Sequence, residues 1–244
     1  MASATRLRSV VSASTASGWL AAIDAHPAWR HRSFGASGDF NAHSSSLPVG
    51  AVASLDLAAI ARSLVDGDVG ALCHAHLGTE LVCDVDRCWV RRQYSPRRYP
   101  PGHAPHSWHQ DGALGFDFLD ASATTTGAAL LSMLTCWIAL TPCGIDAPGL
   151  ELVDREIDTL LPLAALADEA VRARHREREF LRPALQPGDA LAFNGGVLHR
   201  THVRPDMERE RTSLELRFFA AGRIPDRLRH DRFLHLTPTP EICR

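Results

Sequence analysis

A short stretch in the middle of the chain, His106–Phe118 (HSWHQDGALGFDF), places two imidazoles and a carboxylate within six residues. His109 and Asp111 are two residues apart, and side chains at positions i and i+2 share one face of a β-strand. They could therefore bind one metal ion at adjacent coordination positions. Two ligands hold a catalytic metal poorly, so a third has to come from elsewhere in the chain. A second histidine would complete the two-histidine, one-carboxylate set of non-haem Fe(II) oxygenases.

Spacing alone leaves the identity of the histidine ligands open. His199, in FNGGVLHRTHV, follows a predicted strand and a glycine turn, and His202 is its rival three residues later. His103 and His106 compete with His109 for the first position, although neither has an acid two residues further on. A histidine–x–aspartate pattern is weak by itself, because the chain contains 13 histidines. The downstream residues have to decide between these candidates.

The composition excludes several classes of protein. The chain has 244 residues, 45% of them apolar and 22% charged, which is typical of a soluble globular domain. Its formal net charge of -2 argues against nucleic-acid binding, and no stretch is apolar enough for a transmembrane helix. There is no lysine, so Schiff-base chemistry through a lysine is excluded. The six cysteines form no CxxC pair, and we expect them to be reduced in a cytoplasmic protein.

The order of elements predicts a mainly β fold with flanking helices. Short strands with turn signals between them, without regular βαβ alternation, are typical of a sandwich, jelly roll or barrel. We expect helices at Thr15–Ala25, after a cap at Asp56 and over Leu163–Arg174, a disordered N-terminal arm, and a loop at Ser44–Pro48. Strands are predicted at residues 80–85, 88–94, 130–140, 148–153, 187–194, 195–203 and 212–222.

The segments WHQD, CWIALTP, APGLELV, PGDALAFNGGVLHRTHV and RTSLELRFF together resemble the phytanoyl-CoA dioxygenase (PhyH) family of Fe(II)/2-oxoglutarate-dependent oxygenases. The resemblance extends roughly from Glu80 to Gly222. It implies a double-stranded β-helix, which is a cupin-like jelly roll, and the use of Fe(II), 2-oxoglutarate and O2. We expect a single domain over residues 1–244, with an N-terminal arm and helix at 1–50 and the jelly-roll core at 80–222.

The resemblance also assigns roles to individual residues. His109, Asp111 and His199 correspond to the iron ligands of the family. Arg211 corresponds to the arginine that binds the far carboxylate of 2-oxoglutarate, and a planar guanidinium suits that role because it binds a carboxylate through two parallel hydrogen bonds. Arg217 competes with it on the same predicted strand face. Ser213, Thr201, Gln93 and Trp137 match further positions that contact 2-oxoglutarate or line its pocket.

The reaction that the resemblance implies is hydroxylation of a C–H bond in a small-molecule or natural-product substrate, with release of succinate and CO2. Asp111 favours hydroxylation, desaturation or cyclisation over halogenation, since a halogenase carries a small residue in its place. VDREID stands where relatives carry a proline-glycine-serine-histidine segment, so the substrate class cannot be transferred. A zinc hydrolase with the same three ligands and a non-catalytic jelly-roll module are the alternatives. We expect no nucleic-acid or membrane partner, and the oligomeric state is not predicted.

Overall fold

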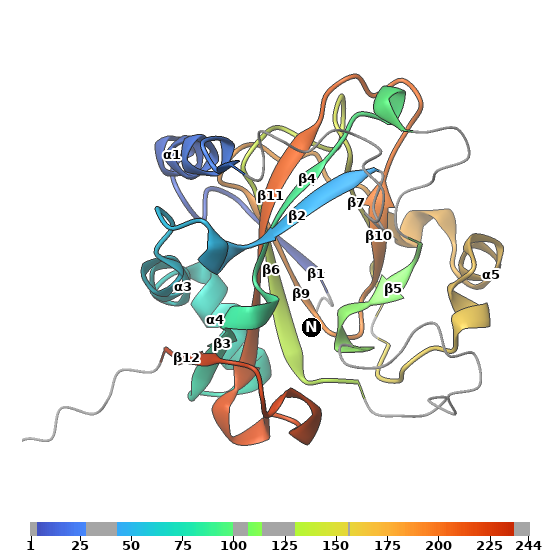
Figure 1. The fold of residues 1–244 in the computed structure, drawn as a ribbon. Helices are drawn as coiled ribbons and strands as arrows, with labels where there is room; N and C mark the ends of the chain where they lie inside the picture. The colour runs from blue at the N-terminus through green and yellow to red at the C-terminus, as the bar shows by residue number, and fades with distance from the viewer. Residues whose placement is uncertain (1–3, 28–42, 100–106, 114–129, 156, 237–244) are drawn as a thin grey trace, which may run out of the picture.

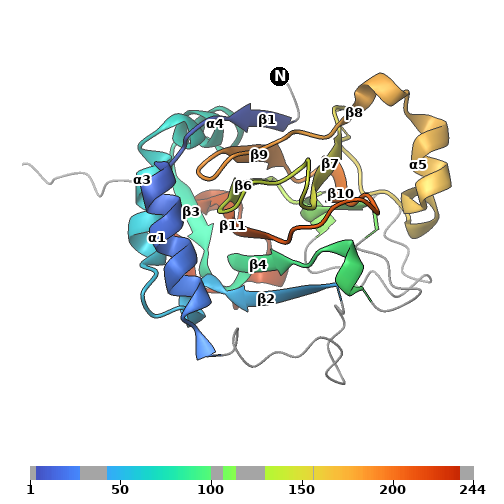
Figure 2. The same ribbon diagram turned by 90° about the horizontal axis from the view of Figure 1, so that it is seen from above.

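Two β-sheets lie opposite each other in the computed structural model, which describes residues 4–27, 43–99, 107–113, 130–155 and 157–236 (Figures 1 and 2). Within these residues the large sheet has eight strands and the small sheet has four. Helices cover the outer face of the large sheet, and the inner faces of both sheets enclose the rest of the core. This is the mainly β jelly roll that the sequence predicts.

The strand order shows how segments far apart in the chain become neighbours. The large sheet runs β1-β9-β6-β11-β3-β12, with β4 also paired to β11 and β2 paired to β4. The small sheet runs β5-β10-β7-β8. The strands are β1 (Ala4–Leu7), β2 (Ser44–Pro48), β3 (Leu81–Asp84), β4 (Trp89–Gln93), β5 (His109–Gln110), β6 (Met133–Ala139), β7 (Gly149–Val153), β8 (Phe180–Leu181), β9 (Ala190–Asn194), β10 (Leu198–His202), β11 (Arg211–Ala220) and β12 (Phe233–His235).

Helices α1 (Ala13–Asp24), α3 (Leu57–Val65) and α4 (Asp68–Leu77) lie together on the large sheet, whereas α5 (Asp168–Arg174) lies beside the small sheet (Figure 1). Asp56 caps α3 as predicted, because its side chain accepts a hydrogen bond from the backbone N–H of Ala59 at 3.0 Å. Leu57, Ile60, Ala61 and Leu64 of α3 are buried in the core at the spacing that the sequence predicts.

Alternation along β11 separates the hydrophobic core from the polar interior. Leu214, Leu216 and Phe218 belong to the cluster packed against the helices. The intervening side chains, which include Arg211, Ser213, Glu215 and Arg217, therefore point the other way, toward the small sheet. The prediction that Arg211 and Ser213 share one face opposite the leucines is confirmed.

Several predicted elements are wrong in type or extent. The predicted disordered arm forms β1 at Ala4–Leu7 and pairs with β9, and the predicted loop at Ser44–Pro48 is β2, paired with β4. Apolar periodicity is weak in both segments, and a sheet partner stabilises each of them as a strand. The predicted helix at Leu163–Arg174 divides into a 3-10 turn, Leu163–Leu166, and α5. Helix α4 and strand β12 were not predicted.

None of the helices in the described ranges has the length and apolar character needed to cross a bilayer. The cysteines in those ranges are unpaired and buried, as the sequence predicts, whereas Cys243 lies outside them. These cysteines are Cys73, Cys83, Cys88, Cys136 and Cys143.

Candidate metal centre and its pocket

Antiparallel pairing of β5 with β10 brings the two histidines together. His199 lies directly opposite His109 in the register, and their ring centroids are 4.1 Å apart. Asp111 follows the two-residue β5 but starts a 3-10 turn, so the prediction that it lies on a strand is wrong. The turn nevertheless directs its carboxylate to the same place. One donor atom from each of His109, Asp111 and His199 lies within 4.8 Å of the others.

Two glycines allow this turn to approach the small sheet closely. The backbone N–H of Gly112 donates to the carbonyl of Gly195 at 2.8 Å. A Cβ at Gly112 would lie 2.7 Å from that carbonyl, and a Cβ at Gly195 would lie 2.6 Å from the carbonyl of Leu131. Any larger residue at either position would push the two segments apart. The sequences QDG and NGG therefore fix how Asp111 is placed relative to His199.

The backbone also orients both imidazoles. His109 Nδ1 lies 2.9 Å from the carbonyl of Ser107, and His199 Nδ1 lies 3.0 Å from the carbonyl of Val197. Because a carbonyl only accepts, each Nδ1 must carry the proton in these hydrogen bonds. In neutral imidazole this leaves Nε2 unprotonated and able to bind a metal. His199 Nε2 lies 3.7 Å from a carboxylate oxygen of Asp111.

Asp111 is held as a buried anion. Burial alone would raise its pKa, but Arg217, His199, His109 and the hydrogen bond from Thr135 outweigh that effect and hold the pKa well below its usual range. Thr135 Oγ1 donates to Asp111 at 2.6 Å, and Arg217 Nη2 lies 3.5 Å from both carboxylate oxygens. The carboxylate is therefore ionised, and its charge is balanced without a bound cation.

A cavity of about 540 Å³ opens from the three donors between the two sheets. Arg211, Arg217 and Glu215 of β11 line it on one side, and Thr201 of β10 lines it on the other. Apolar lining comes from Trp108, Trp137, Leu150, Leu163, Leu166 and Phe193. The metal donors and a buried arginine thus face the same enclosed space.

The two candidate arginines have different partners. Arg217 donates to the carbonyl of Arg87 at 2.6 Å and faces Asp111. Arg211 donates to Ser213 Oγ at 2.6 Å and lies over the ring of Trp137, 4.7 Å from its centroid. Among the described residues, the Nε of each of these two arginines has no hydrogen-bond partner. Burial lowers the pKa of Arg211 to about 10, which still leaves it cationic at neutral pH.

Of the other residues predicted to contact 2-oxoglutarate or to line its pocket, two line the cavity and two do not. Thr201 and Trp137 line it. Gln93 is not among the lining residues: it lies opposite Arg211 in the register, and its amide donates to the carbonyl of His43 at 2.9 Å and to Tyr99 at 2.8 Å. Ser213 likewise contacts Arg211 rather than the cavity.

Of the rival histidines, His202 is absent from the cavity lining, and burial lowers its pKa. His103 and His106 lie outside the described residues. Sequence reasoning missed Thr135, although it lies two residues before Trp137 on one face of β6. Arg91 likewise lines the cavity, and it donates to Glu215 at 3.1 Å.

Comparison with known proteins gives the family. Residues 4–204 match the description "Phytanoyl-CoA dioxygenase (PhyH)". This chain belongs to that family. The match includes the three candidate metal donors and confirms the resemblance seen in the sequence, but it ends before Arg211. No curated protein sequence matches the chain significantly.

Solved structures agree on the fold of this PhyH family member. EctD from S. alaskensis with bound Fe is 16% identical, with a TM-score of 0.61 over 91% of this chain and 74% of that one. The epimerase SnoN, in complex with Fe3+, alpha ketoglutarate and nogalamycin RO, is 15% identical, with a TM-score of 0.56 over 90% of this chain and 80% of that one. The carbocyclase SnoK from nogalamycin biosynthesis is 15% identical, with a TM-score of 0.55 over 90% of this chain and 80% of that one.

Family membership and a donor set of two histidines and one carboxylate agree with the predicted cofactors, Fe(II) and 2-oxoglutarate. Oxygen and nitrogen donors of this kind suit iron, and a buried arginine in the same cavity suits a dicarboxylate. The residues present therefore fit both groups.

Proposed function

We propose that this protein is an Fe(II)- and 2-oxoglutarate-dependent dioxygenase that hydroxylates a C–H bond of a small organic substrate, with release of succinate and CO2. The observation that carries the proposal is one cavity shared by His109, Asp111, His199 and the buried Arg211. Bound Fe(II) and 2-oxoglutarate would supply, with O2, an oxidant able to attack an unactivated C–H bond. A cytoplasmic location is part of the same proposal.

The protein's own residues would prepare the site before any reaction. The Nδ1–carbonyl hydrogen bonds of His109 and His199 direct both Nε2 atoms toward one ion. Thr135 and Arg217 hold the carboxylate of Asp111 in place, so little reorganisation is needed when a metal binds. Arg211 would bind the distal carboxylate of 2-oxoglutarate, with Thr201 as a further hydrogen-bond partner from the opposite wall.

The substrate is proposed to be a small molecule with an apolar body and a polar group. Leu150, Leu163 and Leu166 provide apolar surface in the cavity. Leu163 is 53% exposed, so an apolar side chain at the cavity wall is left open to solvent. Arg91 and Glu215 provide charge in the same cavity. The complete donor set, with Asp111, argues against halogenation and is compatible with hydroxylation, desaturation or cyclisation; solved neighbours of this fold include both an epimerase and a carbocyclase. Hydroxylation is the reaction proposed here.

The proposal is tested by reconstituting the protein anaerobically with Fe(II), adding 2-oxoglutarate and O2, and quantifying succinate by mass spectrometry. Wild-type protein should convert 2-oxoglutarate to succinate slowly without substrate and faster with a correct substrate. His109→Ala should reduce the rate at least a hundredfold because one of three ligands is lost. His202→Ala, three residues after His199 and outside the cavity lining, is the matched control and should retain the wild-type rate.

Full turnover by His109→Ala would show that the ligand assignment is wrong. Hydrolytic activity with Zn2+, independent of 2-oxoglutarate, would favour the zinc hydrolase instead.

A further inference from the structure

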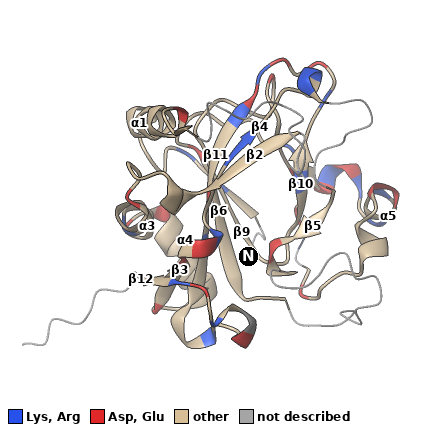
Figure 3. Ribbon diagram, in the orientation of Figure 1, with Lys and Arg blue, Asp and Glu red and all other residues tan. Residues whose placement is uncertain are grey.

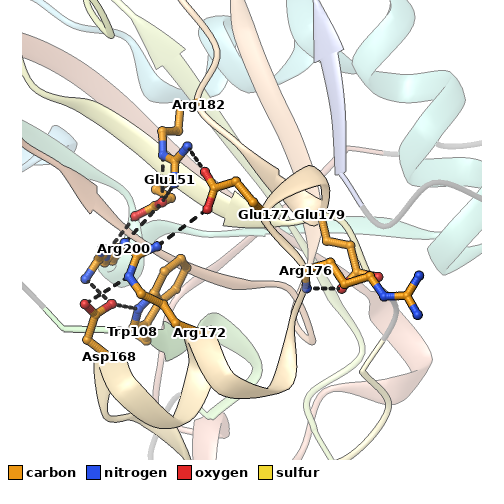
Figure 4. Close-up of polar contacts among 9 residues, drawn as sticks. All are labelled: Trp108, Glu151, Asp168, Arg172, Arg176, Glu177, Glu179, Arg182 and Arg200. Carbon is orange, nitrogen blue, oxygen red and sulfur yellow. Dashed lines mark hydrogen bonds and ion pairs between the residues drawn. The ribbon is translucent and has the colours of Figure 1, made fainter.

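A network of ion pairs joins the small sheet to α5 (Figure 4). Acidic and basic residues are close together on the ribbon in this region (Figure 3). Arg200 of β10 lies opposite Glu151 of β7 in the register, and its Nε donates to that carboxylate at 2.7 Å. Glu151 is only 1% exposed, and Arg182 also pairs with it at 2.6 Å. Such a buried carboxylate needs several cationic partners to offset the loss of hydration. The network therefore anchors β10 firmly to β7.

Asp168, the first residue of α5, extends this network to the residues beside both histidines. Trp108 Nε1 donates to Asp168 Oδ1 at 2.9 Å, and Arg200 Nη1 lies 2.7 Å from the same oxygen (Figure 4). Trp108 immediately precedes His109, and Arg200 immediately follows His199. A single carboxylate oxygen thus joins the chain neighbours of the two proposed metal ligands.

The contact between Trp108 and Arg200 is also direct. The Arg200 guanidinium lies over the Trp108 ring, 4.6 Å from its centroid. Trp108 is 1% exposed and packs against Phe180 of β8. A buried indole N–H must be satisfied by an acceptor, and in this structure Asp168 satisfies it. The indole, the guanidinium and the carboxylate therefore fix one another's positions.

We propose that Asp168 is a positioning residue that sets the geometry of the metal centre by holding Trp108 and Arg200, and through them His109 and His199. This rests on the proposed function, because it takes those histidines to be metal ligands. Asp168 does not line the cavity, so it acts through its neighbours. The 3-10 turn that precedes α5 carries Leu163 and Leu166, which do line the cavity, so this turn and α5 together join the substrate wall to the metal centre.

The test uses Co2+ as the probe. Its affinity for the folded, full-length protein is measured by following the absorption of bound Co2+ during a titration. Asp168→Ala should weaken Co2+ binding by about three- to tenfold, near the lower end of what outer-shell residues contribute, and should alter the ligand-field spectrum of the bound ion. Glu169→Ala is the matched control, since it removes an exposed acid from the next position of the same helical turn. It should leave both readouts unchanged.

A second variant separates positioning from general destabilisation. Trp108→Phe keeps an aromatic ring but removes the N–H, so Asp168→Ala should weaken Co2+ binding less in that background than in wild type. If Asp168→Ala does not fold, Asp168→Leu is used with the same criterion, since it also removes the acceptor for Trp108 and the charge that faces Arg200.

Equal Co2+ affinity and spectra for Asp168→Ala and Glu169→Ala would overturn this inference alone, provided that wild type binds Co2+ and His199→Ala does not. Failure of wild type to bind Co2+ would overturn the proposed function as well.

Discussion

The carboxylate of Asp111 receives more support than any other group of the proposed metal centre. It is buried, accepts a hydrogen bond from Thr135, and faces the guanidinium of Arg217. Arg217 is consequently committed to neutralising an anion that belongs to the protein. Arg211 contacts the neutral side chains of Ser213 and Trp137 and lines the same cavity, so it is the cation left for a second anion. The partners of the two side chains thus favour Arg211 as the binder of 2-oxoglutarate.

Replacing Arg211 with glutamine tests this assignment. The variant should raise the KM for 2-oxoglutarate by about 10- to 100-fold, since a charge-assisted hydrogen bond contributes about 1.5–3 kcal/mol. The measurement is the rate of succinate formation against 2-oxoglutarate concentration. Arg97→Gln, which changes a 63% exposed arginine side chain, is the control and should leave KM unchanged. An unchanged KM in Arg211→Gln would transfer the role to Arg217.

At the scale of elements, the site depends on the contact between the 3-10 turn that begins at Asp111 and the residues that lead into β10. The Gly112 and Gly195 backbones touch, and this contact sets the position of Asp111 beside β10. The other support for the site is the 3-10 turn between β3 and β4, because the carbonyl of Arg87 in that turn accepts a hydrogen bond from Arg217. Both supports lie outside the regular strands that bear the histidines.

Substitution of Gly195 by alanine should destabilise the fold and weaken metal binding. Its Cβ would lie 2.6 Å from the carbonyl of Leu131, and overpacking of this kind costs about 1–3 kcal/mol. Thermal unfolding and metal titration provide the measurements. The matched control is Gly18→Ala within α1, where no atom lies within 4 Å of the new Cβ, and it should stabilise the protein by about 0.5–1 kcal/mol. A Gly195→Ala protein as stable as wild type would contradict the close-contact argument.

The turn between β3 and β4 predicts a pH effect on stability. Burial and repulsion from Asp231 raise the pKa of Asp84 from 3.8 to about 6, although Arg87 opposes this. Because this pKa is raised in the folded state, protonated Asp84 contributes to the free energy of unfolding. That contribution is fully present below about pH 4 and is lost as the pH rises through about 6. Asp84→Asn should therefore exceed wild type in free energy of unfolding by about 1–2 kcal/mol at pH 8, and the difference should vanish at pH 4.

Denaturant unfolding at the two pH values measures this difference. A variant less stable than wild type at pH 8 would show that the ion pair with Arg87 outweighs burial. Asp66→Asn, at the C-terminal cap of α3 and outside this turn, is the control for changing a charge.

Sequence reasoning predicted the elements whose residues alternate clearly and missed those that depend on a distant partner. The strand β6 follows from a continuous apolar run, and the arginines on one face of β11 follow from a period of two. The serine-rich β2 becomes a strand only because β4 pairs with it, which no local pattern reveals. Likewise the histidine–x–aspartate spacing predicted a pair that the structure does bring together, but for a different reason. The Gly112–Gly195 contact, rather than strand alternation, places Asp111.

At the scale of the whole molecule, the cavity exists because two sheets of different size face each other. Helices α1, α3 and α4 pack on the outer face of the large sheet, so its inner face is left for the side chains of the cavity (Figure 1). The small sheet contributes His109, His199 and Thr201, and the large sheet contributes Arg211 and Trp137. Metal and 2-oxoglutarate are accordingly predicted to bind between the sheets and to contact both of them.

The most direct test of this account is a crystal structure of protein grown anaerobically with Fe(II) and 2-oxoglutarate, with anomalous data at the iron edge. The account predicts a single iron peak among His109, Asp111 and His199, and a distal carboxylate of 2-oxoglutarate paired with Arg211. An iron peak elsewhere in the molecule, or iron at this place without either histidine as a ligand, would contradict it.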